Sequence, residues 1–134
     1  MKLINSYLYI PVSNFDKSVE WYQDVFGFKL KLSDPLYRDL ESHSGIRIML
    51  IERRNNINSH MMYDTGAQAS YGFMVKNIQN VHSELISKGV KVTEIGDYQG
   101  KSFSFFDPDD NKIEIWEEDN ELQNQSEFKS NNNK

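Results

Sequence analysis

The sequence lacks cysteine, contains few prolines and glycines (3 and 7 of 134 residues), and has fewer basic than acidic side chains. The absence of cysteine excludes a disulfide framework, a zinc site built from thiolates and a cysteine nucleophile. The 15 basic and 20 acidic residues give a net charge of −5, and Arg53 and Arg54 form the one basic pair, so we expect no nucleic-acid partner. No apolar run approaches the roughly 20 residues of a membrane span, so we expect no membrane partner.

The residues that are present indicate one globular domain followed by a polar tail. Hydrophobic residues make up 38% and aromatic residues 13% of the chain, which is enough for a hydrophobic core. Met1 to Ser6 are expected to begin a strand rather than a signal peptide, and we therefore expect a cytoplasmic protein. Residues 118–134 are rich in Asn, Gln, Glu, Ser and Lys, with Leu122 and Phe128 as their large apolar residues, and this composition predicts a disordered tail.

The first half of the chain predicts a strand, a helix and three further strands. Ser13 or Asn14 is expected to cap a helix that ends at Gly27. Its buried face is predicted from apolar side chains at helical spacing, which are Phe15, Val19, Tyr22 and Phe26. The predicted strands are residues 3–12, 28–33, 36–42 and 46–52, and residues 53–69 are expected to form a long polar connection.

The same plan recurs in the second half. A strand over residues 70–76 precedes a helix that is capped by Asn77 and ends at Gly89, and strands follow at residues 91–96, 102–107 and 111–117. Asn14 and Asn77 are 63 residues apart, and Gly27 and Gly89 are 62 residues apart. The nearly constant offset indicates two related βαβββ halves.

Two segments carry a resemblance to a known family. They are residues 10–22 with Phe26-Gly27-Phe28, and residues 106–115 with the turn Asp107-Pro108-Asp109-x-Asn111 before Ile113-Glu114-Ile115. Together they resemble the vicinal-oxygen-chelate superfamily, which includes glyoxalase I, extradiol dioxygenases, and the fosfomycin- and bleomycin-resistance proteins. The resemblance covers residues 3–117. It implies an α+β fold in which two βαβββ modules form a curved mixed sheet around a shared cleft, with helices on the outer faces. Module one would span residues 1–53, the linker 54–69 and module two 70–117.

The resemblance also implies which positions would hold a metal. The four metal-ligand positions of metal-using members correspond to Tyr7, Glu52, Tyr71 and Glu114 of this sequence. Those members usually have His or Gln at the position of Tyr7 and His at the position of Tyr71. A phenol has a pKa of about 10 and is a poor ligand at neutral pH, and two carboxylates alone make a weak site. We therefore expect no bound metal or other cofactor, and if a divalent metal binds, Glu52 and Glu114 would be its ligands.

The three histidines are poor candidates for an alternative metal site, although His60 could fold over the cleft with its loop. His43 is predicted to lie in a turn, His60 in the long connection and His82 on the second helix. None shares an element with another at the spacing of metal ligands.

These observations favour a small-molecule binding protein similar to the bleomycin-resistance branch. Its cleft would be aromatic and acidic, suited to a cationic or aromatic ligand, and the resemblance implies a homodimer. The residues expected to line the cleft are Tyr7, Tyr9, Glu52, Tyr71, Phe73, Glu114 and Trp116.

Other interpretations stay open. Glu114 could be a solvent-facing strand residue, and Glu52 could pair with a neighbouring arginine. The chain could be an enzyme, namely a lyase, isomerase or dioxygenase that uses a divalent metal held by Glu52 and Glu114. It could also act through a protein partner.

Overall fold

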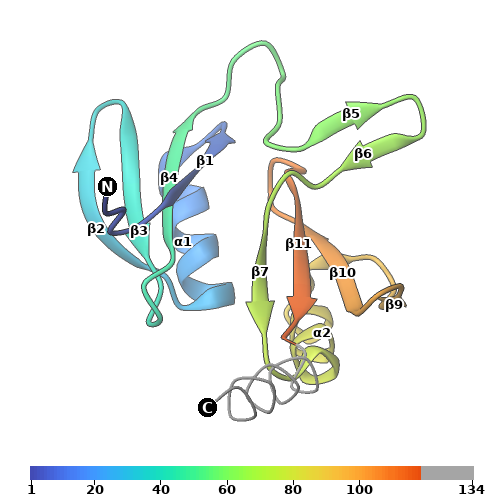
Figure 1. The fold of residues 1–134 in the computed structure, drawn as a ribbon. Coiled ribbons are helices and arrows are strands. Elements are labelled where there is room, and N and C mark those ends of the chain that lie inside the picture. The colour runs from blue at the N-terminus through green and yellow to red at the C-terminus, as the bar shows by residue number, and fades with distance from the viewer. Residues whose placement is uncertain (119–134) are drawn as a thin grey trace, which may run out of the picture.

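The computed structural model of the protein describes residues 1–118, which form two βαβββ modules (Figure 1). In the first module β1 pairs in parallel with β4, and the remaining pairs are antiparallel, giving the strand order β1-β4-β3-β2. This arrangement follows from the chain order, because the helix between the first two strands carries the chain across the sheet. The elements are β1 (Tyr7–Val12), α1 (Phe15–Phe26), β2 (Lys29–Asp34), β3 (Tyr37–Glu41) and β4 (Arg47–Glu52).

The second module repeats the arrangement. Its sheet has the order β7-β11-β10-β8, with β7 parallel to β11 and the short β9 paired to β10. The predicted α+β fold with two βαβββ modules is therefore confirmed. The elements are β7 (Gly72–Val75), α2 (Ile78–Ser87), β8 (Lys91–Val92), β9 (Gly96–Asp97), β10 (Lys101–Phe106) and β11 (Lys112–Glu117).

The helix ends are fixed by the local signals that the sequence contains. The side chain of Asn14 accepts a hydrogen bond from the Lys17 amide at 3.0 Å, and Asn77 caps α2 through the Asn80 amide at 3.4 Å. Gly27 ends α1 in the left-handed conformation with φ of 74°, which a glycine adopts without strain.

Three predicted segments differ from the observed ones. The first strand begins at Tyr7 rather than residue 3, because its partner strand starts at Arg47, opposite Tyr7, and offers no backbone groups to residues 3–6. The predicted strand 91–96 is divided into β8 and β9. The predicted polar connection 53–69 contains a short hairpin of β5 (Met61–Tyr63) and β6 (Gly66–Gln68).

One hydrophobic core joins the two modules. Helix α1 covers the first sheet, and its Trp21 also stacks on Phe105 of β10, with ring centroids 6.1 Å apart. Tyr22 of α1 and Phe105 are both fully buried. The modules are therefore packed through α1 rather than through a shared ladder of strands, since β1 and β7 remain unpaired edges of separate sheets.

Two further expectations concern the ends of the chain and the membrane. Most of the predicted tail, residues 119–134, lies outside the described residues. Within residues 1–118 neither helix has the length and apolar character needed to cross a bilayer.

Candidate functional site

Each sheet has one face covered by helices and one face that carries no helix, which we call its open face. Along β1, Ile10 and Val12 are buried, whereas Tyr7 and Tyr9 alternate with them and are 53% and 54% exposed. The two tyrosine rings contact each other edge to face, with centroids 5.3 Å apart. The open face of the first sheet therefore presents a pair of aromatic rings to solvent.

A partly buried ion pair lies on the same face as these tyrosines. Asp39 of β3 is 6% exposed and accepts hydrogen bonds from Arg47 of β4, one of them at 3.1 Å. Both residues alternate with the buried positions of their strands and so lie on the same side as Tyr9. Because the two charges neutralise each other, the open face of the first sheet has no free charge at its centre.

Glu114 and Trp116 lie on the open face of the second sheet. They alternate along β11 with Ile113 and Ile115, which are buried in the core. Two glycines make room for them: a Cβ at Gly72 would collide with the carbonyl oxygen of Glu114, and a Cβ at Gly100 would come within 2.7 Å of the Trp116 ring. A larger residue at Gly72 would have to displace the backbone of β11 at Glu114, and one at Gly100 would have to displace the Trp116 ring.

Three of the residues predicted for the cleft lie elsewhere. Glu52 follows the alternation of Ile48 and Leu50, so it projects to the helix-covered side of β4, where it pairs with Arg54 at 3.2 Å. Phe73 is 7% exposed and belongs to the core. These positions place Glu52 and Glu114 on different surfaces.

Tyr71 precedes β7 and is also directed inward. Its hydroxyl and the Ser59 hydroxyl are both buried without a hydrogen-bond partner among the described residues. Burial raises the pKa of Tyr71 above its usual value, so the phenol stays protonated. The structure therefore brings Tyr7 together with Tyr9, and Glu114 together with Trp116, but it does not add Tyr71, Phe73 or Glu52 to either pair.

The histidines are separated, as the sequence predicts. His60 accepts a hydrogen bond at Nδ1 from the Lys112 amide at 3.0 Å, and burial together with the Lys112 charge lowers its pKa. His82 contacts the Thr93 carbonyl at 2.9 Å, and His43 lies in the β3–β4 turn. Among residues 1–118 no three side chains of the His, Cys, Asp or Glu type are close enough to hold a metal ion.

The turn between β10 and β11 has a role that sequence reasoning missed. The Tyr22 hydroxyl donates to Asp107 at 2.9 Å, and Asn111 donates through Nδ2 to Asp107 at 2.9 Å and to the Pro11 carbonyl at 2.8 Å. We call these three side chains, Tyr22, Asp107 and Asn111, the junction network, because they connect the two modules. The turn signal was visible in the sequence, but its partner on α1 was not.

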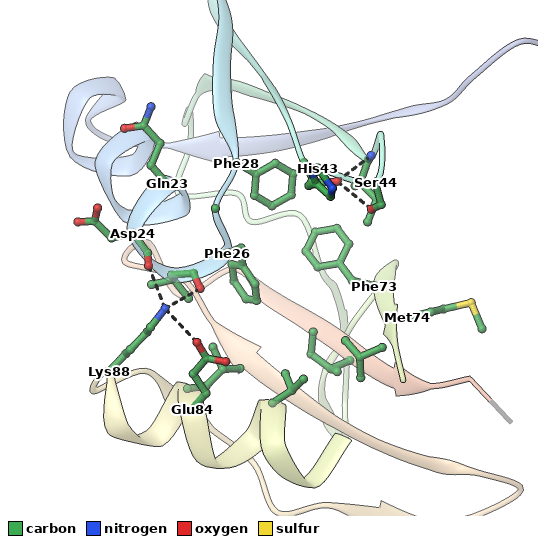
Figure 2. Close-up of a pocket in the computed structure, with 18 residues that line it drawn as sticks. Gln23, Asp24, Phe26, Phe28, His43, Ser44, Phe73, Met74, Glu84 and Lys88 are labelled. Carbon is green, nitrogen blue, oxygen red and sulfur yellow. Dashed lines mark hydrogen bonds and ion pairs between the residues drawn. The ribbon is translucent and has the colours of Figure 1, made fainter. Parts of the chain in front are cut away.

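The aromatic and acidic residues of the two open faces do not line the groove between the modules. Tyr7, Tyr9, Glu114 and Trp116 are absent from the linings of four grooves found among the described residues, although Arg47 and Gly72 line one of these grooves. A cavity of about 540 Å³, which we call the junction groove, instead lies between the two modules. Figure 2 shows the rings of Phe26, Phe28 and Phe73 within it, next to the β3–β4 turn that carries His43 and Ser44.

Comparison with known families gives one match. The sequence profile of the Glyoxalase/Bleomycin resistance protein/Dioxygenase superfamily matches residues 3–115. The curated proteins contain no match to the chain.

Solved structures share the fold at low sequence identity. An integron cassette protein from the mobile metagenome of the Halifax Harbour sewage outfall is 23% identical, with a TM-score of 0.67 over 84% of this chain and 96% of its own. TnmS3, an antibiotic binding protein from Streptomyces sp. CB03234, is 20% identical, with a TM-score of 0.66 over 89% and 99%. The fosfomycin resistance protein FosX from Listeria monocytogenes is 17% identical, with a TM-score of 0.70 over 90% and 98%. At these identities the similarity concerns the fold alone.

Proposed function

Because the chain belongs to the glyoxalase/bleomycin resistance protein/dioxygenase superfamily, we propose that it is a metal-independent small-molecule binding protein whose ligand lies against the open faces of its sheets. The observation that carries the proposal is the exposed pair Tyr7 and Tyr9 on one open face, matched by Trp116 beside Glu114 on the other. Exposed aromatic rings next to a carboxylate suit a flat ligand with positive charge.

A resident divalent metal does not fit the residues of this chain. The four family positions hold Tyr7, Glu52, Tyr71 and Glu114, and Glu52 projects to the helix-covered side, where it pairs with Arg54. The raised pKa of Tyr71 makes its phenolate harder to form. FosX has a structure with Mn(II), but among residues 1–118 of this chain no three side chains of the His, Cys, Asp or Glu type are close enough to hold a metal ion, so we derive no chemical step through a metal.

We further propose that two copies are needed to complete each site. In one chain the open faces belong to separate sheets and expose large apolar side chains, with Leu32 at 51% and Met74 at 65%. Contact between the open face of the first sheet and that of the second sheet of another copy would cover these side chains. Each dimer would then hold two ligand sites, with the tyrosines from one copy and Glu114 and Trp116 from the other.

A matched pair of dyes tests the ligand class. Proflavine is a cationic three-ring compound, and acridine at pH 7.5 is its uncharged analogue. Fluorescence titration should show that Glu114→Gln weakens proflavine binding by about 1–3 kcal/mol and leaves acridine unchanged, because it removes charge but not shape. Trp116→Ala should weaken both dyes. Unchanged affinity of both dyes in both variants would contradict the placement of the site.

Mixing variants tests the shared site. Tyr9→Ala and Trp116→Ala chains should each bind poorly alone. A mixture of the two, after chain exchange, should recover binding, because a mixed dimer contains one site with neither substitution. Light scattering that shows a single chain in solution, or the absence of recovery in mixed dimers, would contradict the two-copy site.

A further inference from the structure

The two βαβββ modules contain the same turn at equivalent positions. Ser42 donates from its amide to the Ile46 carbonyl at 2.8 Å, and Asp107 donates to the Asn111 carbonyl at 3.1 Å. Each turn also has a second backbone hydrogen bond. The Gly45 amide donates to the Ser42 carbonyl at 3.0 Å, and the Asp110 amide donates to the Asp107 carbonyl at 2.9 Å. The β3–β4 turn and the β10–β11 turn are therefore structural counterparts.

Their side chains differ where the modules meet. Asp107 reaches Tyr22 of α1, eight residues after the Asn14 cap, and the residue eight positions after the Asn77 cap of α2 is Leu85. At the other end of the junction the pair that corresponds to Tyr22 and Asp107 is thus Leu85 and Ser42. Neither side chain can form the bridging hydrogen bond, and both line the junction groove.

Three phenylalanines, Phe26, Phe28 and Phe73, line the junction groove. Phe73 lies with its ring centroid 6.1 Å from that of Phe26 and 6.0 Å from that of Phe28. Leu85 and Ile115 add aliphatic surface. A volume of about 540 Å³ is within the usual range of small-molecule pockets, roughly 300–1,000 Å³.

Lys88 and Glu84 at the groove edge are already paired with each other, and the carboxylate of Asp24 points away from the groove (Figure 2). Lys88 donates to the Asp24 carbonyl at 3.0 Å and to the Val25 carbonyl at 3.2 Å, and it forms an ion pair with Glu84 at 3.4 Å (Figure 2). The lysine charge is thus offset by Glu84 and by the carbonyl end of α1. A charged ligand would have to displace these contacts, whereas a neutral ligand would not.

We infer that the junction groove is a second binding site, specific for a neutral aromatic small molecule and separate from the open faces. The second module has Leu85 at the position where the first has Tyr22, so one aromatic ring is missing at this end of the junction. The space lies between the phenylalanines and the β3–β4 turn, and the ring of an aromatic ligand can occupy it. This inference does not depend on the ligand proposed for the open faces.

The test uses N-phenyl-1-naphthylamine, an uncharged dye whose fluorescence rises in apolar surroundings, with the full-length protein. We expect saturable binding of one dye per chain. The double variant Ser42→Asp/Leu85→Tyr, which rebuilds the missing pair and fills the groove, should abolish it. Because this variant alters the core, Glu84→Trp provides an independent block at an exposed edge residue, and Ser83→Trp on the same helix, outside the groove, is its matched control.

The outcomes separate the two sites. Phe26→Leu should weaken the dye site that Glu84→Trp blocks by about two- to tenfold, the effect of one lost aromatic contact, whereas Tyr9→Ala and Trp116→Ala should leave the affinity of that site unchanged. Loss of dye binding in Tyr9→Ala or Trp116→Ala would overturn the inference, because the dye would then occupy the open faces. Equal binding to the Glu84→Trp and Ser83→Trp proteins would overturn it as well. So would dye binding that disappears as protein concentration rises, because a second copy would then occupy the groove.

Discussion

The two ends of the junction between the modules are formed by turns with the same backbone hydrogen bonds. One end is closed by a network of hydrogen-bonded side chains, and the other end leaves a groove. At one end, Asp107 and Asn111 of the β10–β11 turn bind Tyr22 and the backbone of β1, and the space between the modules is closed. At the other end, Ser42 of the β3–β4 turn bonds only within its own turn and leaves the junction groove. A duplicated fold can therefore use one copy of a turn to hold the modules together and the other to bound a cavity.

The difference depends on side-chain length and partner. A buried polar group stabilises a fold only if it is hydrogen-bonded, and Asp107 accepts bonds from Tyr22, Asn111 and the Asp109 amide. The Ser42 side chain is too short to cross the junction, and the residue on the other side, Leu85, offers no hydrogen-bonding group. The closed end is thus expected to contribute far more to stability than the open end.

The largest effect is expected from Asp107→Ala. Asp107 is 4% exposed, and its removal leaves the buried groups of Tyr22 and Asn111 without their acceptor. We expect a loss of about 2–4 kcal/mol in the free energy of unfolding, measured with urea. Ser42→Ala at the equivalent position should cost less than about 1 kcal/mol. Equal losses at the two turns would contradict the proposed asymmetry.

A smaller effect is expected from Tyr22→Phe, which removes one hydroxyl and keeps the ring. Its hydrogen bond to Asp107 at 2.9 Å is buried, so the variant should lose about 1–2 kcal/mol. In the double variant with Asp107→Ala the two losses should not add, because both remove the same bond. Additive losses would show that the hydroxyl acts independently of Asp107.

The junction network should also respond to pH. Burial raises the pKa of Asp107 above its ordinary value, so the folded state holds the proton more tightly than the unfolded chain. This contribution to stability is complete below the ordinary value of about 4 and is lost as pH rises through the raised value. Asp107→Asn cannot titrate, so the stability advantage of the native protein over this variant should shrink across that interval. A constant difference between pH 3 and pH 7 would contradict the raised pKa.

Local signals in the sequence predicted most of the fold. The caps Asn14 and Asn77 and the stop at Gly27 depend on residues close together in the chain, and they predicted both helices correctly. The additional hairpin of β5 and β6 was missed because Met61–Tyr63 has no apolar alternation and its strands are only three residues long.

The candidate site was less predictable, because it depends on which side of a strand each residue faces. Both sides of β4 carry apolar residues, with Met49 and Ile51 on one and Ile48 and Leu50 on the other, so the alternation did not assign Glu52 to a face. The junction network joins residues 85 positions apart, Tyr22 and Asp107, and no local pattern reports such a contact. The ligand-binding role of Tyr7, Tyr9, Glu114 and Trp116 stays a prediction.

The smallest effect concerns the backbone that the two turns share. The third residue after the start of each turn has positive φ, and it is Gly45 with φ of 96° in one turn and Asp110 with φ of 62° in the other. The left-handed conformation costs a residue with a side chain roughly 1–2 kcal/mol, whereas glycine loses about 0.5–1 kcal/mol of unfolded-state entropy on ordering. Asp110→Gly should therefore stabilise the protein by about 0.5–1 kcal/mol, which a urea titration can resolve.

The reciprocal change, Gly45→Ala, should destabilise by a similar amount, although a Cβ there would meet no atom within 4 Å. This comparison separates backbone strain from lost contacts, because neither substitution touches the junction network. If Asp110→Gly instead destabilised the protein as strongly as Tyr22→Phe, the Asp110 side chain would contribute to the closed end of the junction. The two turns would then differ in more than the contrast between Tyr22 with Asp107 and Leu85 with Ser42.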